Sequence, residues 1–279
     1  MKPAAFRRAV GWVMADYKFS LRRACRALGF ARSSWHYRSQ ATPWTELVGR
    51  LRTLAASRPS SGYRMLYRLL RREGFVVNHK RIYRLYRAEA LMVRQRHRKR
   101  VAAALRIPLA QPRGPRVQWA MDLVSDVTWG GRRFRILVVL DVFSRECLGL
   151  LVETSIGGTR VTRLLDELVA VHGKPEVLVT DNGPEFRGKA LDEWGHRNGV
   201  KLHFIRPGKP VENAFVESFN GRLRSEHLNQ NWFVDLDDAR QRIEAWRVDY
   251  NEVRPHGALD GMTPREYAEA NRGLASRAA

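Results

Sequence analysis

The stretch Val117–Val124, which reads VQWAMDLV, determines how the second half of this chain is interpreted. Its apolar residues are typical of a buried strand, yet Asp122 lies among them. An isolated carboxylate is costly to bury unless it is paired or binds a cation. The stretch therefore predicts a strand that carries a functional acid.

Two more carboxylates stand at positions that suggest a shared role. Asp181 follows the apolar run Val177–Thr180 and opens a turn with the sequence DNGP. Glu217 follows after thirty-five intervening residues, in a stretch with the pattern of a helix. Taken singly, Asp181 would be a turn residue and Glu217 a surface residue. Taken together, three acids from two strands and one helix predict an all-oxygen site for a hard divalent cation.

Basic residues are concentrated in the first part of the chain. Residues 1–116 contain 28 Lys and Arg against 4 Asp and Glu, whereas residues 117–279 contain 22 against 24. This asymmetry predicts a polyanionic partner, and nucleic acid in particular, for the first part. Arginine dominates the excess, and its planar group can donate two hydrogen bonds to one phosphate. A solvated basic surface or a membrane-surface patch fits less well, because the basic residues fall on helical segments separated by turns.

Cysteine, histidine and apolar patterns exclude other classes of protein. Cys25 and Cys147 are far apart, which excludes a disulfide framework, and the eight His residues show no paired spacing typical of zinc. No apolar run approaches transmembrane length, and the N-terminus lacks the long apolar stretch of a signal peptide. We therefore expect a cytoplasmic protein without a membrane partner.

The first part of the chain is predicted to be helical. Leu21–Leu28, capped by Ser20 and stopped by Gly29, precedes a second short helix over Ser33–Tyr37 that Ser33 would cap. This length and punctuation are typical of a helix-turn-helix. Three further helices are expected at 45–57, 63–72 and 79–87, the last capped by Asn78. On these helices and their flanks, the predicted DNA contacts are Arg64, Lys80, Arg81 and Arg84.

Beyond a Pro- and Gly-rich segment the pattern changes. Strands are expected at 117–124, 135–141, 146–152, 175–180 and 201–206, with helices at 161–171, at 191–198 and from 211 onward. This order predicts a mixed α/β sheet covered by helices. The expected divisions are a helix-turn-helix-like segment at 1–42, a basic helical DNA-binding module at 43–105, a linker at 106–116, an α/β domain at 117–272 and a tail at 273–279.

The helix around Glu217 is predicted to have a polar face. Side chains three, four and seven positions apart share one face of a helix. That face would hold Asn213, Asn220 and Arg224 beside Glu217, with the small Gly221 leaving room for DNA to come close. A separate ambiguity concerns Asp126, which strand alternation places on the same side as Asp122, so the pattern alone does not dismiss it.

Several motifs together resemble the Asp-Asp-Glu catalytic core of the retroviral-integrase superfamily. They are WAMD at 119–122, TDNGPEF at 180–186, PGKP at 207–210 and NAFVESFNG at 213–221. More narrowly, the chain resembles the OrfB product of bacterial insertion sequences of the IS-three family. That family's C-terminal signature is similar to YNEVRPH at 250–256 with Thr263 and Pro264, and its DNA-binding helices are similar to GYR at 62–64 and NHKRIYRLY at 78–86.

The resemblance implies a ribonuclease-H-like fold and a DNA transposase. Asp122, Asp181 and Glu217 would hold magnesium or manganese, two ions to a site. The enzyme would cleave DNA at element ends and direct the freed 3′-hydroxyl to a target strand. Arg224 matches a basic position of the family, and Lys209 of the PGKP motif is a further expected DNA contact. The implied partners are double-stranded DNA, other copies of the chain and an upstream OrfA product or fusion, in association with the bacterial nucleoid.

Two other functions are compatible with these residues. A structure-selective nuclease of the same fold would hydrolyse nucleic acid without joining it. A DNA-binding regulator would keep the fold without catalysis, although the presence of all three carboxylates argues against it.

Overall fold

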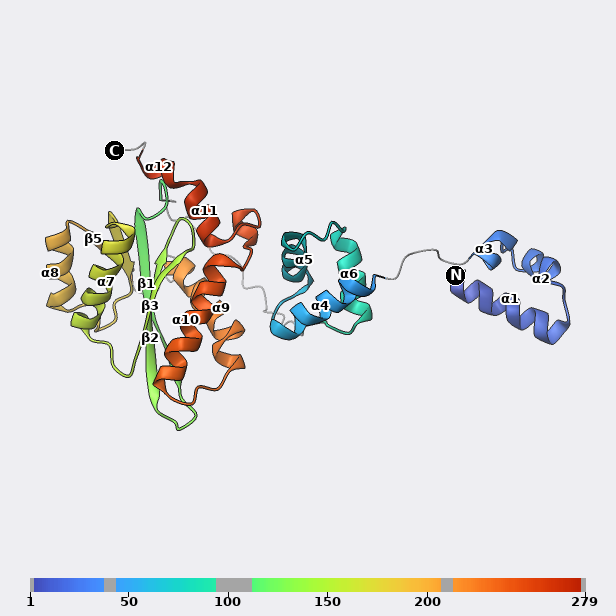
Figure 1. Ribbon diagram of the computed structural model, residues 1–279, viewed down its shortest axis with the longest axis horizontal. Helices are drawn as coiled ribbons and strands as arrows, with labels where there is room; N and C mark the ends of the chain where they lie inside the picture. Colours follow the sequence, from blue (N-terminus) through green and yellow to red (C-terminus); the bar gives the residue numbers. More distant parts are fainter. Residues whose placement is uncertain (1–2, 38–43, 94–111, 207–212, 277–279) are drawn as a thin grey trace. The chain divides into compact units, whose positions relative to one another are not determined.

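The computed structural model describes residues 3–37, 44–93, 112–206 and 213–276 (Figure 1). The chain divides into two units, Met1–Glu46 and Leu47–Ala279. Within the described ranges, no helix is both long and apolar enough to cross a membrane.

The first unit is built from three helices, α1 (Pro3–Tyr17), α2 (Leu21–Ala27) and α3 (Arg32–His36). The predicted start of α2 is confirmed, because the Ser20 hydroxyl accepts a hydrogen bond from the Arg23 amide. Its end is also confirmed at Gly29, whose φ of +62° is a conformation that glycine adopts without strain. Val10, Ala24 and Cys25 form the small buried core.

Two features of this unit differ from the expectation. Ser33 does not cap α3, because the helix begins at Arg32 and already includes Ser33. The extended residue Ala31 precedes the helix and forms no side-chain cap. The helix α1 was not predicted, since only Val10 of its fifteen residues is buried and its apolar pattern is weak. Arg7 of α1 instead holds α3 by donating two hydrogen bonds to the Ser34 carbonyl, at 3.0 and 2.8 Å.

Three helices open the second unit: α4 (Thr45–Ser57), α5 (Tyr63–Arg72) and α6 (His79–Ala88). Each has an apolar stripe, and the stripes meet in one core of Leu and aromatic side chains. The predicted cap of α6 is confirmed, because the Asn78 side chain accepts a hydrogen bond from the Lys80 amide at 2.8 Å. Packing uses the apolar stripes, so most arginines of these helices are left on the outer faces.

The α/β domain that follows contains a five-stranded sheet in the order β3-β2-β1-β4-β5. Its strands are β1 (Gln118–Val127), β2 (Arg133–Asp141), β3 (Cys147–Glu153), β4 (Val177–Thr180) and β5 (Lys201–Phe204). The first three strands are antiparallel, whereas β4 pairs in parallel with both β1 and β5. The predicted mixed sheet is confirmed, with strand positions close to those expected.

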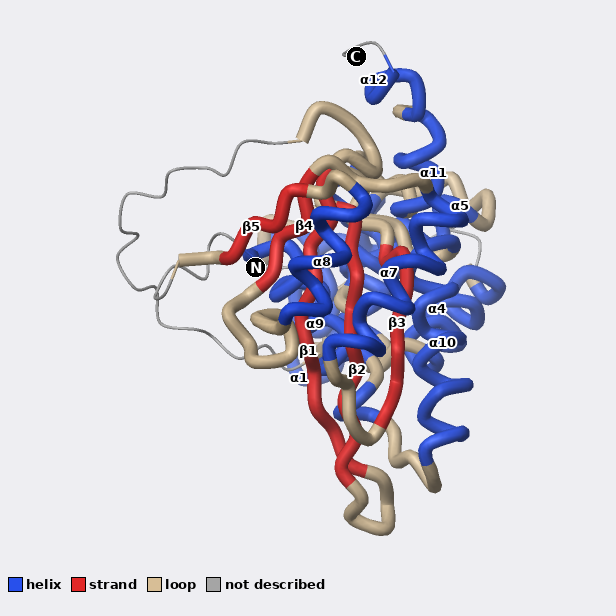
Figure 2. The backbone as a smooth tube through the Cα atoms, turned by 90° about the vertical axis from the view of Figure 1, so that its left-hand side faces the viewer, coloured by secondary structure: helices blue, strands red, loops and turns tan. Residues whose placement is uncertain are grey.

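Helices cover both faces of this sheet (Figures 1 and 2). On one face lie α7 (Gly158–His172) and α8 (Lys189–Asn198), and on the other α9 (Ala214–Glu226) and α10 (Leu236–Glu252). Strand alternation divides the buried residues between two cores, so that Trp119 faces α7 and α8 while Ala120 faces α9 and α10. Two short helices, α11 (Pro264–Ala270) and α12 (Arg272–Ser276), follow.

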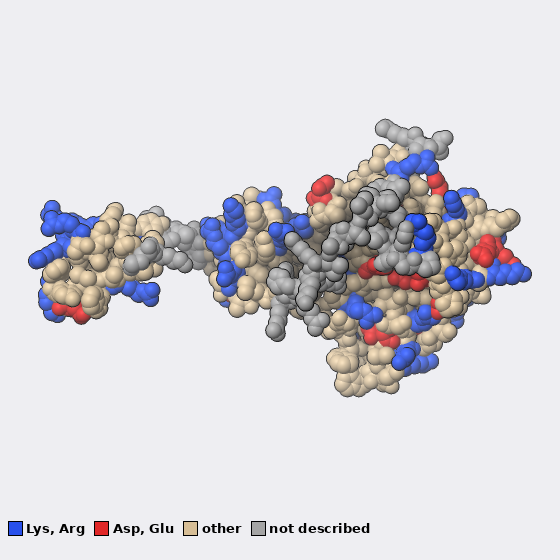
Figure 3. Space-filling view, turned by 180° about the vertical axis from the view of Figure 1, so that it is seen from behind, with Lys and Arg blue, Asp and Glu red and all other residues tan. Residues whose placement is uncertain are grey.

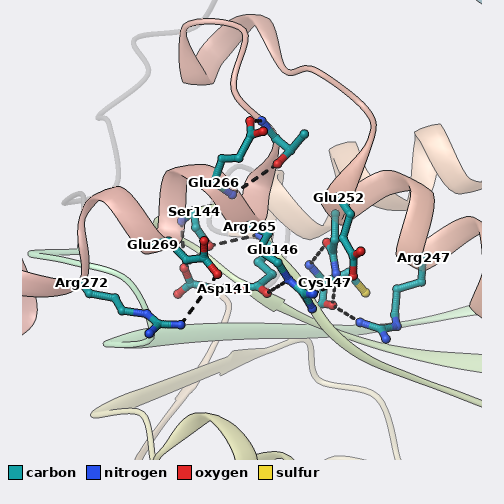
Figure 4. A network of polar contacts seen from close by, with 12 residues as sticks. Asp141, Ser144, Glu146, Cys147, Arg247, Glu252, Arg265, Glu266, Glu269 and Arg272 are labelled. Carbon is teal, nitrogen blue, oxygen red and sulfur yellow. Dashed lines mark hydrogen bonds and ion pairs between the residues drawn. The ribbon is translucent and has the colours of Figure 1, made fainter. Parts of the chain in front are cut away.

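A β-bulge in β3 is completed by a residue from the far end of the chain. Val139 pairs with Gly149 and Leu140 pairs with Cys147, so Leu148 is the extra residue. The buried Asn251 of α10 accepts a hydrogen bond from the Cys147 amide at 2.9 Å and donates one to its carbonyl at 2.8 Å. Arg247 donates a third hydrogen bond, at 3.0 Å, to the same carbonyl (Figure 4). The Asn251 side chain thus satisfies both backbone polar groups of Cys147 at the bulge.

We predict that Asn251→Ala destabilises the protein. The buried Cys147 amide would lose its partner, which costs about 1–3 kcal/mol. In a chain of this size each kcal/mol lowers the unfolding midpoint by about 2–4 °C. Thermal unfolding followed by circular dichroism measures the change. Asn271→Ala is the matched control, since Asn271 donates only to the Tyr267 carbonyl one turn earlier. Equal effects of the two substitutions would contradict the role given to Asn251.

Candidate active site

Asp122 lies in the middle of β1, on the face covered by α9. Its Oδ1 accepts a hydrogen bond from the Leu123 amide at 2.7 Å, and its Oδ2 accepts one from the Asn220 side chain at 2.8 Å. Burial raises the pKa of Asp122 to about 6, and the nearby charges of Asp181 and Glu217 raise it further, against the two hydrogen bonds. The three predicted acids are therefore close enough to interact.

The parallel pairing of β1 with β4 brings Asp181 to the level of Asp122. Ala120 is opposite Val179 in this ladder, and each acid follows two residues later. The Asp181 carboxylate also accepts a hydrogen bond from the Gly183 amide at 3.0 Å, which closes the predicted turn. A Cβ at Gly183 would lie 3.1 Å from the Asp181 carboxylate and 3.0 Å from that of Glu185. The glycine therefore lets the backbone pass close to both acids.

Glu217 reaches the site from the exposed side of α9. Burial raises its pKa, although its side chain remains accessible to solvent. The helix is fixed to β1 at three successive points, because Asn213 donates to the Met121 carbonyl, Asn220 to Asp122 and Arg224 to the Ser125 carbonyl. These contacts hold the backbone of Glu217 next to the strand that carries Asp122.

The donor set suits a hard cation, although the side chains are not gathered around one. Among the described residues, no three His, Cys, Asp or Glu side chains stand close enough together to hold a metal ion as they are placed. All three acids offer oxygen, which magnesium and manganese prefer. Glu217 is exposed, so the packing of α9 does not fix its side chain. The Asn220 Oδ1, buried and without a partner, marks an unfilled polar position beside Asp122.

The predicted DNA contacts on α9 and at its N-cap differ in how accessible they are to a ligand. Arg224 is exposed, as expected, and its guanidinium donates to the Ser125 carbonyl at 3.0 Å. Asn220 points at Asp122 and orients that acid instead of facing solvent. Asn213 is only 4% exposed and donates to the Met121 carbonyl, so the structure does not place it where DNA could contact it. The expected contact at Lys209 lies outside the described residues.

The basic positions of the helical parts are mostly accessible. Arg64, Lys80 and Arg84 are exposed, and Arg81 is half-buried. Figure 3 shows many Lys and Arg side chains and few acids on the helical parts that precede the sheet. This surface has the composition expected of a phosphate-binding face.

Two acids near the site have other partners. The Asp126 carboxylate accepts a hydrogen bond from the amide of its neighbour Val127 at 2.8 Å, which does not involve it with the other acids. Glu185 was not predicted as a site residue, but it lies beside Asp181 and forms an ion pair with Arg135. Burial opposes ionisation of Glu185, and the ion pair nevertheless keeps its pKa below the usual value. The sequence feature that could have indicated this ion pair is Arg135, a charged residue inside the largely apolar strand β2.

Comparisons with known proteins agree with this geometry. Two family models described as "Integrase core domain" match residues 112–210 and 198–264, and one described as "HTH-like domain" matches residues 46–100. The "Insertion element IS407 uncharacterized 31.7 kDa protein" of Burkholderia multivorans is 46% identical, over 92% of this chain and 93% of its own length. The chain belongs to this family of insertion-element proteins with an integrase core.

More distant relatives extend the similarity. The "Putative transposase InsK for insertion sequence element IS150" of Escherichia coli is 26% identical, over 89% of this chain and 93% of its own length. A solved structure of a simian T-cell lymphotropic virus intasome in complex with PP2A regulatory subunit B56 gamma has a TM-score of 0.52 at 15% identity, covering 80% of this insertion-element protein and 75% of the matched chain. At that identity the likeness concerns the fold, and it confirms the predicted ribonuclease-H-like class.

We predict that Asp122→Asn changes how stability depends on pH in the absence of metal. The folded state raises the pKa of Asp122 from 3.8 to about 6, so it binds this proton more tightly than the unfolded state does. The stabilising contribution of the proton is complete below about pH 4 and is lost as the pH rises to about 6. Relative to wild type in EDTA, Asp122→Asn should therefore gain stability across this window and stay level above it. Thermal unfolding at a series of pH values measures the difference, and a constant difference would contradict the shift.

Proposed function

We propose that this chain is the DNA transposase of an insertion sequence, and that Asp122, Asp181 and Glu217 form its catalytic centre. The observation that carries the proposal is the β1–β4 register, which brings Asp122 and Asp181 to one level beneath a helix fixed to β1. Within the family, the finer assignment that we propose is the OrfB type of the IS-three group. Its place of action would be the nucleoid in the bacterial cytoplasm.

The three acids would hold two magnesium or manganese ions. Such a pair stabilises the attacking and leaving oxygens of a phosphodiester during in-line displacement. Asn220 would keep the Asp122 carboxylate turned toward the centre through its 2.8 Å hydrogen bond. Raised pKa values of Asp122 and Glu217 reflect the cost of collecting acids in a partly buried place, a cost that bound cations would offset.

The DNA would be held mainly by the first part of the chain. Counterion release makes clustered Lys and Arg the main source of affinity for duplex DNA, whatever its sequence. The exposed Arg64, Lys80 and Arg84 belong to this surface, and Arg81 lies on the same helix as Lys80 and Arg84. Near the catalytic centre, the exposed Arg224 is one turn of helix beyond Asn220 and would contact the end of the element.

We predict that Asp122→Asn, Asp181→Asn and Glu217→Gln each abolish strand cleavage while DNA binding is kept. Loss of metal-assisted charge stabilisation costs several kcal/mol, which corresponds to a fall of about a thousandfold or more in rate. Cleavage of labelled element-end DNA in magnesium measures the rate, and gel shifts measure binding.

The matched control is Asp126→Asn, which removes a carboxylate from the same strand. It should retain cleavage, because Asp126 lies four residues beyond Asp122 on β1, which is about 13 Å along the strand. Wild-type cleavage by any of the three triad variants would remove that residue from the catalytic centre. Strand-joined products distinguish a transposase from a nuclease that only hydrolyses.

Assembly on DNA is proposed to require more than this chain. Joining two element ends calls for two DNA segments in one complex, and therefore for several copies. The longest described helix, α10, has 17 residues, and α2 to α6 are each 13 residues or shorter, which leaves no room in the described ranges for three or more heptads. An upstream OrfA product, supplied separately or as a fusion, would provide the missing association.

We predict that the chain alone sediments as a monomer or a weak oligomer without DNA and joins strands poorly. Fusion to the upstream product should increase strand joining and its preference for element ends. Analytical ultracentrifugation and a strand-transfer assay on paired-end DNA measure the two properties. Efficient end-specific joining by the unfused chain would overturn the need for the upstream partner.

A further inference from the structure

A cavity next to the candidate active site is lined by part of the C-terminal motif at 250–256. No residue of this motif belongs to the proposed catalytic centre. Arg254 and His256 of this motif face the cavity, and α9 contributes Phe215, Ser218 and Arg222. Arg145, from the turn between β2 and β3, and Arg68 of α5 also line the cavity. Four guanidinium groups therefore border one hollow.

Their positive charge is only partly balanced. Arg254 forms an ion pair with Glu226. Arg145 donates to the Val142 carbonyl and lies 3.2 Å from the centroid of the Phe215 ring, so a neutral group and an aromatic face are its neighbours. Within the described residues no carboxylate forms an ion pair with Arg145 or Arg222. Burial lowers the pKa of Arg145 to about 10, and the charge of Arg222 also lowers it, although Tyr250, Asp141 and Tyr267 oppose the change.

His256 adds a buried polar group without a partner. It is 4% exposed, and its Nε2 has no hydrogen-bond partner. Burial lowers its pKa to about 3, and Arg254, Arg222 and Arg68 lower it further. An anion in the cavity would reverse these effects, because opposite charge favours the imidazolium form, in which both ring nitrogens donate.

The cavity and the catalytic acids use neighbouring faces of one helix. Phe215, Ser218 and Arg222 are spaced by three and four residues and form one stripe of α9. Glu217 and Arg224 lie on the adjacent stripe, since successive residues turn by about 100°. Arg222 lies five positions after Glu217 along α9, which is a rise of about 7.5 Å. A strand held at Glu217 could therefore place a neighbouring phosphate at the cavity.

We propose that this cavity is a phosphate-binding site and that its occupant is a backbone phosphate of the DNA strand next to the active site. The assignment of DNA rests on the proposed function, whereas the preference for a phosphate rests on the cations alone. Arginine is the side chain best suited to a tetrahedral oxyanion, because its group donates paired hydrogen bonds. The ligand would supply the negative charge that Arg145 and Arg222 lack and a partner for His256.

The alternative is that the cluster only stabilises the fold. A purely structural Arg222 would stabilise the free protein, and its loss would lower the unfolding midpoint. A ligand-binding Arg222 repels its neighbours in the free protein, so its loss would leave that midpoint unchanged or raise it. The two roles therefore predict different changes in the unfolding midpoint when Arg222 is removed, before any ligand is added.

The first experiment measures thermal unfolding of the full chain in phosphate and in chloride at equal ionic strength. Phosphate should raise the wild-type midpoint, because a ligand that binds only the folded state stabilises it. Arg222→Gln should lose this increase without a lower midpoint in chloride. The control Arg163→Gln removes the same charge from the exposed face of α7, which covers the other side of the sheet, and should keep the increase.

A second variant tests the site without removing an arginine. Ser218 is exposed at the cavity, and Ser218→Glu would bring a carboxylate to the cations. The variant should unfold at a higher temperature in chloride and respond less to phosphate. An unchanged phosphate response in both Arg222→Gln and Ser218→Glu would overturn the site.

DNA binding then identifies the source of the phosphate. Loss of one phosphate contact should reduce the slope of log affinity against log salt by about one for Arg222→Gln and leave it unchanged for Arg163→Gln. Loss of the phosphate response with an unchanged slope would overturn DNA as the occupant and indicate free phosphate or a nucleotide. Because the unfolding experiment does not depend on cleavage, the site can fail while transposition by the catalytic acids stands, or the reverse.

Discussion

The parallel pairing of β1 with β4 is the constraint on which the rest of the catalytic domain depends. Its register sets Ala120 opposite Val179, and through them it sets the two aspartates side by side. Hydrogen bonds between strands fix this register, and the buried side chains on both faces prevent a slip, since a shift by one residue would turn every apolar group to the wrong side. The acids are therefore positioned by backbone pairing, and their own mutual repulsion is tolerated.

The helix α9 adds further polar residues, including Glu217, to this pair of strand acids. Polar groups at its N-cap, its middle and its last turns fasten it to β1, so the helix has a defined height over the sheet. One of its faces carries Glu217, and the next carries Arg222. A helix that was attached only by apolar packing could slide by a fraction of a turn. Directional hydrogen bonds exclude that sliding and hold both polar faces in place.

Much of this arrangement was accessible from the sequence, because period-two and helical patterns report which face is buried. Asp122 stood out for being an acid in an apolar strand, and the caps at Ser20 and Asn78 follow local chemistry. Partners from distant segments were not accessible. Asn213 has the spacing of an exposed helix residue, yet it bonds to Met121, ninety-two positions away. The role of Asn251 depends on its contact with Cys147 of β3. The role of Arg222 depends on the cavity that it lines together with the C-terminal motif.

The bulge in β3 also has a consequence for synthesis. Cys147 and Asn251 are 104 positions apart, and the edge strand of the sheet lacks these bonds until the second residue is available. Domains fold as the chain leaves the ribosome, and contacts of high sequence separation form late. An unfinished or truncated copy would expose an incomplete sheet edge and be open to degradation. The sheet that carries the catalytic acids is thus completed only after residue 251 has been synthesised.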